Sequence, residues 1–215
     1  MDGTLVDTES IHKEIYRELL KEHDKILTDD LFNSISGMAN DNTWDIIAKE
    51  TKLNIPKKIL QKEFWKRAYE RVGNCELMPG VGKLLLHLHS NNIPMAIASS
   101  TTQHMYARKS ASHTELFKVF HHVVCGGSDP AVVENKPNPQ IFIVCMDRFE
   151  DKPKPCDCLI FEDVLNGVTA AIKAGSQCVA IPPKQALKED FKLATLILNS
   201  LEEFKPEQFA LPKYN

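Results

Sequence analysis

Two adjacent acidic residues, Glu162 and Asp163, follow a short apolar run and are the first candidates for chemistry in this sequence. Carboxylate oxygens are the hard ligands that magnesium prefers, and no neighbouring cluster of cysteine and histidine favours zinc instead. The same pair also fits the start of a helix, where an acidic residue caps free backbone N–H groups. The pair therefore predicts either a magnesium site or a helix cap.

Further polar groups follow other apolar runs. Ser99 and Ser100 end one run, where hydroxyl and backbone N–H groups are able to hold phosphate oxygens, although serines also serve as ordinary helix caps. A loop lysine is usually just solvated, but Lys136 is followed by Pro137 and Pro139, which restrict the backbone and favour a fixed ammonium position. Together with the acidic pair, these groups would hold a phosphate beside a divalent cation.

The elements that must position these groups change character along the chain. Apolar residues recur at three- to five-residue steps within residues 8–74, which predicts several short helices with no strand among them. From residue 79 onward, helical stretches alternate with short apolar runs, at residues 84–88, 94–98, 119–124, 158–161 and 178–181. This alternation predicts an α/β fold, a doubly wound, Rossmann-like parallel sheet that binds ligands at the carboxyl ends of its strands.

Composition and charge restrict the class of the protein. The chain has 215 residues, 43% hydrophobic and 26% charged, with a net charge of −3, so it is globular in composition and offers no basic surface to nucleic acid. No apolar stretch approaches the roughly 18 residues that a membrane-spanning helix needs, and the first residues do not resemble a signal peptide. We therefore expect a cytoplasmic protein without a nucleic-acid or membrane partner.

The other potential metal ligands favour structural roles. The six cysteines lie in apolar surroundings within a chain too long to need disulfide bonds, so we expect reduced thiols. His87 and His89 are two residues apart on a predicted helix and therefore point to different faces. His121 and His122 are adjacent in a predicted strand and point to opposite faces. The sequence also lacks glycine-rich nucleotide loops and a G-x-S-x-G nucleophile motif.

The ordered set of candidate motifs resembles that of the haloacid dehalogenase-like hydrolase superfamily. The similar segments are residues 2–9 for its first motif, Ser99 for the second, Lys136 for the third and Glu162 with Asp163 for the fourth. The resemblance covers nearly the entire chain, and it implies the architecture of subfamily I. In that architecture residues 1–12 and 79–215 form the hydrolase core domain, and residues 13–78 form an inserted helical cap domain.

The resemblance also implies a role for each candidate. In this family one aspartate attacks phosphorus to form an aspartyl-phosphate, and a second, two residues later, protonates the leaving alcohol and then activates water. Asp2 matches the second aspartate. A magnesium ion would be held by the nucleophile, the Asp2 backbone carbonyl and Asp163, with Glu162 arranging its waters. The groups that neutralise charge on the phosphoryl group would be Ser99, the Ser100 N–H and Lys136.

In this pattern the nucleophile would stand directly before Met1, at the end of the first, central strand of the sheet. We therefore expect the natural protein to extend upstream of the given sequence. About four buried apolar side chains of such a strand, at roughly 1.5–3 kcal/mol each, are worth on the order of 6–12 kcal/mol. Net domain stability is only about 5–15 kcal/mol. Residues 1–215 alone are thus predicted to fold marginally and to lack phosphatase turnover.

The sequence therefore predicts a magnesium-dependent phosphomonoesterase that hydrolyses a small sugar or nucleotide monophosphate. A sugar-phosphate mutase of the same fold is one alternative, and isomer formation instead of phosphate release would identify it. An alternative of a different class is a non-catalytic relic that binds phosphate and metal without hydrolysis. An in-frame stop codon directly upstream of Met1 would favour the relic, whereas an upstream apolar run ending in Asp would favour the enzyme.

Overall fold

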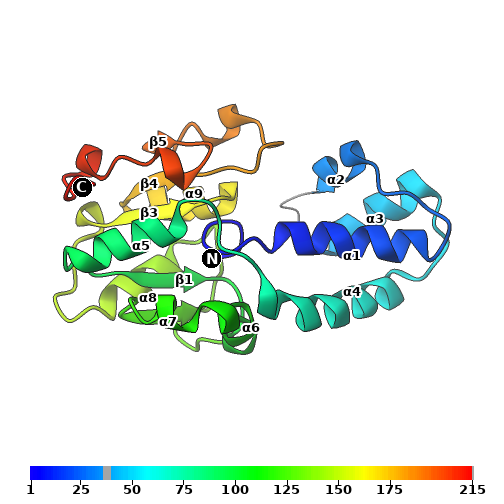
Figure 1. Cartoon of the computed structure of the whole chain (residues 1–215), viewed down its shortest axis with the longest axis horizontal. Coiled ribbons are helices and arrows are strands. Elements are labelled where there is room, and N and C mark those ends of the chain that lie inside the picture. The colour runs from blue at the N-terminus through cyan, green and yellow to red at the C-terminus, as the bar shows by residue number, and fades with distance from the viewer. Residues whose placement is uncertain (36–39, 215) are drawn as a thin grey trace.

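The computed structural model describes residues 1–35 and 40–214. The first part of the chain forms helices α1 (Glu9–Lys21), α2 (Asp29–Ile35), α3 (Asn40–Thr51) and α4 (Lys57–Arg71). In Figure 1 these helices lie together on one side of the molecule, and the strands with their helices lie on the other. The N-terminus lies between the two parts, whereas the C-terminus lies at the far edge of the strand-containing part.

Aromatic side chains hold the first helices together. Tyr16 of α1 stacks on Phe64 of α4 with the ring centroids 4.5 Å apart, and Trp44 of α3 meets Tyr16 at 5.1 Å. All three rings are buried, because the apolar residues of each helix recur on the face that points inward. The predicted short helices are therefore confirmed in this region, and they enclose a hydrophobic cluster of their own.

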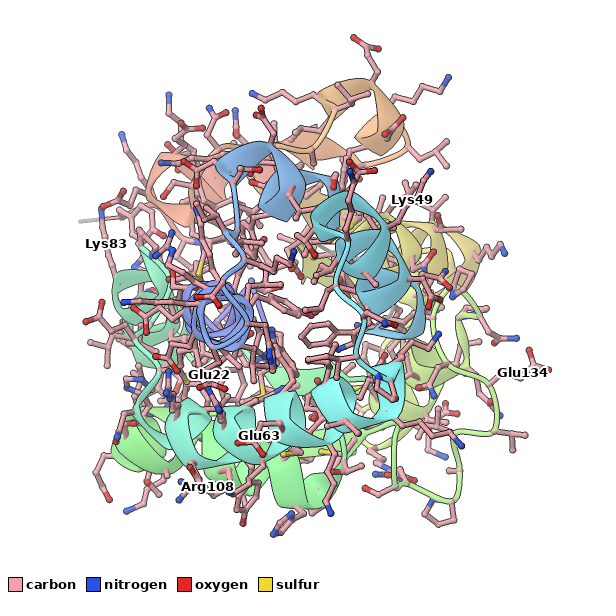
Figure 2. All side chains as sticks on the ribbon, turned by 90° about the vertical axis from the view of Figure 1, so that its right-hand side faces the viewer. Glu22, Lys49, Glu63, Lys83, Arg108 and Glu134 are labelled. Atoms are coloured by element: carbon pink, nitrogen blue, oxygen red, sulfur yellow. The ribbon has the colours of Figure 1, made fainter. Side chains whose placement is uncertain are left out.

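Ion pairs join α1 to α4 on the outside of this cluster. Arg67 of α4 pairs with Glu22 of α1 at 2.8 Å and with Glu63 of its own helix at 3.1 Å. Figure 2 looks onto these helices and labels Glu22 and Glu63. Exposed pairs of this kind contribute about 0–1 kcal/mol each, so the aromatic contacts carry most of the stability here.

The second part of the chain alternates strands with helices. Its strands are β1 (Ala96–Ser99), β2 (His122–Cys125), β3 (Leu159–Glu162), β4 (Gln177–Ala180) and β5 (Leu196–Ile197). Its main helices are α5 (Val81–Ser90), α6 (Gln103–Lys109), α7 (Thr114–Phe117), α8 (Gln140–Asp147) and α9 (Leu165–Ala174). β1 pairs with β2, β3 with β4 and β4 with β5, always in parallel. The predicted α/β class with parallel strands and crossover helices is confirmed.

The two sheets present matching faces to the same helices. Ile97 of β1 and Phe161 of β3 contact the hydrophobic cluster that includes α5, whereas Ala98 and Ile160 contact the cluster that includes α8 and α9. Since alternate residues of a strand point to opposite faces, the sheets form one layer between two layers of helices. This arrangement brings the carboxyl ends of β1 and β3 to the same edge of the fold.

One edge of β1 and one edge of β3 make no strand pairing within residues 1–35 and 40–214. The carbonyl of Ser99 accepts a hydrogen bond on the β2 side, and the carbonyl of Glu162 accepts one on the β4 side. The preceding residues, Ala98 and Phe161, therefore direct their backbone groups to the opposite edges.

The first of the five apolar runs is not a strand. Residues 84–88 belong to helix α5, in which Leu84, Leu85 and Leu88 are buried while Leu86 is 58% exposed. Burial at positions i, i+1 and i+4 is the pattern of a helix with one apolar face, whereas a strand would bury alternate residues. The apolar run alone did not distinguish the two structures.

The remaining sequence features have plain structural roles. None of the described helices is long and apolar enough to cross a membrane. The six cysteines are free thiols. His87 and His122 each contact a backbone carbonyl oxygen, those of Pro212 and Cys145.

Candidate functional site

Lys136 connects the carboxyl ends of β1 and β3. Its Nζ donates a hydrogen bond to the Ala98 carbonyl oxygen at 3.2 Å and lies 2.5 Å from Glu162 Oε1. The side chains of Lys136 and Glu162 are only 10% and 6% exposed. Because neither charge is well hydrated, each depends on the other for compensation. Lys136 lies in the loop that precedes α8, and the centroid of the Phe142 ring on that helix lies 4.7 Å from Lys136 Nζ.

Asp163 lies against the first residues of the chain. The Thr4 hydroxyl donates a hydrogen bond to Asp163 Oδ1 at 2.9 Å. Gly3 has a positive φ of 64°, and a Cβ at this position would collide with the Asp163 carboxylate, so the close approach requires glycine. Burial, and then the neighbouring charge of Glu162, raise the pKa of Asp163 to about 7. A cation bound beside the two carboxylates would therefore stabilise their ionised forms and lower the pKa of Asp163.

The Asp2 carboxylate is bound by Lys109 and Thr8. Its Oδ1 lies 2.6 Å from Lys109 Nζ and accepts a hydrogen bond from the Thr8 hydroxyl at 3.0 Å. Burial acts to raise the pKa of Asp2, but the charge of Lys109 and the hydrogen bonds from Lys109 and Thr8 outweigh it, so the pKa is lowered. The structure therefore holds Asp2 as a carboxylate.

Ser99 and Ser100 follow β1 and differ in exposure. Ser99 is 4% exposed and its Oγ accepts a long hydrogen bond of 3.4 Å from the Thr101 N–H. Ser100 is exposed. Ser99 directly follows Ala98, whose carbonyl holds Lys136, so the serines and the lysine occupy the same strand end. The structure thus brings the four predicted segments together through a continuous series of contacts.

The oxygen atoms at this edge are of the kind that suits magnesium. Asp163, Glu162 and the backbone beside Gly3 carry hard oxygen atoms, and the pKa of Asp163 is raised by burial and then by the charge of Glu162. Within the described residues no three side chains of His, Cys, Asp or Glu gather closely enough to hold a metal by themselves. A magnesium ion here would therefore need backbone, water or phosphate oxygens in addition to the acidic pair.

Comparison with known proteins identifies the family of the chain. The model of the haloacid dehalogenase-like hydrolase family matches residues 1–175. The chain is 39% identical over 214 residues to the probable pseudouridine-5'-phosphatase of Drosophila melanogaster, covering 100% of this chain and 93% of the relative. The chain belongs to the haloacid dehalogenase-like hydrolase family.

Further relatives and solved structures extend the comparison. (DL)-glycerol-3-phosphatase 1, mitochondrial, of Arabidopsis thaliana is 35% identical over 219 residues, which cover 100% of this chain and 72% of the relative. A HAD family hydrolase of Deinococcus radiodurans R1, solved with phosphate and sodium, has a TM-score of 0.82 at 21% identity, covering 100% and 96% of the two chains. Beta-phosphoglucomutase of Clostridium difficile has a TM-score of 0.68 at 22% identity, covering 97% and 92%. The fold is thus shared by phosphatases and mutases.

Local sequence similarity points to one branch of the haloacid dehalogenase-like hydrolases. Residues 77–80, 124–130, 158–163 and 199–209 resemble pseudouridine-5'-phosphatase. The Drosophila match confirms this resemblance over the whole chain.

Sequence reasoning missed three side chains that hold the site together. Thr4 and Thr8 lie within the first motif, close to Asp2 in the sequence, and this position indicates that their hydroxyl groups contact the acidic residues of the site. Lys109 left no such signal, because a lysine near the end of a helix is normally solvated. Only the fold shows that it is 7% exposed and that it meets Asp2.

Proposed function

We propose that the natural protein is a magnesium-dependent phosphomonoesterase acting on a small sugar or nucleotide monophosphate. The observation that carries this proposal is the series of contacts from Ala98 through Lys136 and Glu162 to Asp163 and Thr4. In this series the acidic pair lies beside Lys136, whose side chain is 10% exposed, and near the buried Ser99, and we infer that these groups bind a cation and a phosphate. Membership of a hydrolase family and relatives named as phosphatases support the same reaction class.

Different groups at the strand ends would bind the phosphoryl group and the magnesium ion. The Ser99 hydroxyl, the Ser100 N–H and the Lys136 ammonium would hold the oxygens of the transferring phosphoryl group and stabilise its charge. Asp163 and the Asp2 backbone carbonyl would hold magnesium, with Glu162 positioning its waters. When bound, the ion supplies additional charge neutralisation at the phosphoryl oxygens. Glu162 also holds Lys136 in place through their contact.

Asp2 would transfer protons in both halves of the reaction. In the first, an aspartate oxygen attacks phosphorus and the ester P–O bond breaks. Asp2, a carboxylate in the protein without substrate, has by then taken up a proton, and it gives that proton to the leaving oxygen to form the alcohol. In the second, Asp2 takes a proton from the water that attacks the aspartyl-phosphate, which returns the nucleophile and releases phosphate. The alternating roles need a carboxylate that is fixed near the scissile bond.

We also propose that the nucleophile precedes Met1 in the natural protein. The Met1 amine lies within electrostatic range of Lys136, Asp163 and Glu162, so a residue joined to it would enter the site. The unpaired edges of β1 and β3 offer backbone partners for a strand that leads to this position. Residues 1–215 alone would then retain the binding groups and lack turnover.

The first candidate substrate is pseudouridine 5'-phosphate. It rests on the 39% identity to the Drosophila protein and on the branch-specific similarity of residues 199–209. The helices within residues 13–78 would act as a cap that selects the alcohol part of the substrate. A small phosphorylated metabolite in the cytoplasm is the corresponding partner, with no nucleic acid or membrane required.

The decisive experiment compares the protein extended by its natural upstream residues with residues 1–215. Both are incubated with magnesium and with a panel of pseudouridine 5'-phosphate, glycerol phosphate and sugar monophosphates, and both phosphate release and isomer formation are measured. We expect phosphate release by the extended protein alone, and loss of that activity with EDTA. Isomer formation would instead identify a mutase, and an upstream stop codon with phosphate binding but no release would identify a non-catalytic relic.

A further inference from the structure

Lys109 is a buried charge that the proposed roles do not use. Lys109 and Glu162 are the charged residues that are buried in the described part of the chain, and both lie beside the candidate site. Lysine is almost never fully buried unless its charge is paired. Its partner is Asp2, whose Oδ1 lies 2.6 Å from Lys109 Nζ. This ion pair offsets the hydration that the ammonium loses on burial.

The contacts to Asp2 distinguish its two carboxylate oxygens. Lys109 Nζ and the Thr8 hydroxyl both bind Oδ1. Within the described residues no hydrogen bond is made to Oδ2. A carboxylate held through one oxygen keeps the other available for proton exchange with a substrate or with water.

Helix α6 holds Lys109 in place from the strand-containing part of the molecule. The Lys109 carbonyl oxygen accepts a hydrogen bond from Cys75 Sγ at 3.3 Å. The adjacent Arg108 donates to the backbone carbonyls of Tyr69 and Glu70, at the end of α4. The end of α6 is therefore fixed on two sides, and the ammonium reaches Asp2 from a rigid element and not from a mobile loop.

We infer that Lys109 is a positioning residue that fixes the Asp2 carboxylate through Oδ1 so that Oδ2 delivers the proton to the leaving oxygen. This inference rests on the proposed phosphatase function. In the step concerned, the nucleophilic aspartate oxygen forms a bond to phosphorus as the ester P–O bond breaks, and the electron pair of the broken bond stays on the leaving oxygen. Oδ2, which has taken its proton from the attacking water of the preceding turnover, gives that proton to the leaving oxygen. Lys109 contacts neither substrate nor phosphate in this step and acts only through Asp2.

The leaving group provides the test. An alkyl alcohol leaves phosphorus only when it is protonated, whereas p-nitrophenolate leaves readily without a proton. We would measure kcat/KM, which reports on the reaction up to release of the leaving group, with an alkyl phosphate and with p-nitrophenyl phosphate. The protein is the active, upstream-extended chain with magnesium, carrying Lys109→Met. Lys118→Met is the matched control, because Lys118 is exposed and pairs with Glu115 of its own helix region.

We expect Lys109→Met to lower kcat/KM for the alkyl phosphate about 10²-fold and to change it little for p-nitrophenyl phosphate. Lys118→Met should leave both unchanged. An equal loss with both esters would mean a general structural role and would overturn the inference, as would no loss with either. If the unmodified extended protein releases no phosphate from any ester, the proposed function itself fails, which is a separate result.

A double-mutant cycle covers the case in which Lys109→Met leaves Asp2 unpaired and prevents folding. Asp2→Asn with Lys109→Met removes both charges together, so neither is left buried alone. If Lys109 acts through Asp2, adding Lys109→Met to Asp2→Asn brings no further loss of kcat/KM with p-nitrophenyl phosphate. A further loss in the double variant shows that Lys109 acts independently of Asp2, and the inference is then wrong.

Discussion

The helical part and the carboxyl edge of the sheet are stabilised by different forces. Tyr16, Trp44 and Phe64 pack ring against ring in the helices, and the charged residues there lie on the outside. At the sheet edge, Glu162 and Lys136 are only 6% and 10% exposed in their side chains and depend on each other for charge compensation. Apolar packing contributes stability directly, whereas buried ion pairs roughly balance their own desolvation. The charged groups at the sheet edge therefore serve the chemistry of the site and add little to the stability of the fold.

The largest expected effect is in the helical part. Phe64→Ala removes a ring that is 1% exposed and contacts Tyr16 and Trp44, so it should lower the free energy of unfolding by about 3–5 kcal/mol. Urea denaturation followed by circular dichroism measures this change. Ile59→Ala on the same helix is the control, because Ile59 is 59% exposed and its loss should cost less than about 1 kcal/mol. Equal losses for the two variants would contradict the assignment of this cluster as the stabilising core.

A smaller effect, with a different signature, is expected at the sheet edge. Lys136→Met leaves the Glu162 carboxylate buried without its partner, which should cost about 3 kcal/mol of stability. The double variant Lys136→Met with Glu162→Gln removes both charges and should recover most of that loss. Urea denaturation of the two variants distinguishes a charge effect from lost packing. Additive losses would show that the residues stabilise the protein independently and that the comparison with the helical part is mistaken.

The sequence predicted more of the fold than of the site's internal contacts. Periodicity identified the helices and four of the strands, because burial follows from local spacing, and it failed at residues 84–88, where a helix buries leucines in close succession. The short strand β5 carries too few residues to leave a pattern. The positions of Ser99 and Lys136 at strand ends followed from the topology of parallel sheets.

The partners of the acidic residues were not predictable in the same way. The bond from Thr8 to Asp2 is local, but the pair of Lys109 with Asp2 joins residues far apart in the chain, and no periodicity encodes such a contact. A buried lysine and a solvated lysine look alike in a sequence. The distinction depends on how α6 packs against the start of the chain, which only the tertiary structure specifies.

The smallest effect concerns His12, where the helical part meets Asp2. Burial lowers the pKa of His12 to about 4 from its ordinary value of 6.5; the charge of Asp2 acts in the opposite direction, and the charge of Lys109 adds to the lowering. Its ring contacts Phe64 and Trp65, so the neutral imidazole is packed as part of the aromatic cluster. The folded protein therefore resists the protonation that the unfolded chain accepts below pH 6.5.

The sign of the resulting pH dependence follows from proton counts. Between pH 6.5 and pH 4 the unfolded chain binds a proton at His12 that the folded chain does not, so stability is lost as the pH falls through this window. The partly exposed ring reduces the effect to about 1 kcal/mol between pH 7 and pH 5. Urea denaturation at the two pH values measures it, and His12→Gln should remove that part of the slope. His23→Gln, beyond the end of α1 and exposed, should leave the slope intact. If His12→Gln and the unmodified protein lose stability in parallel, the imidazole is not held neutral by the aromatic cluster, and apolar packing does not extend to the boundary with Asp2.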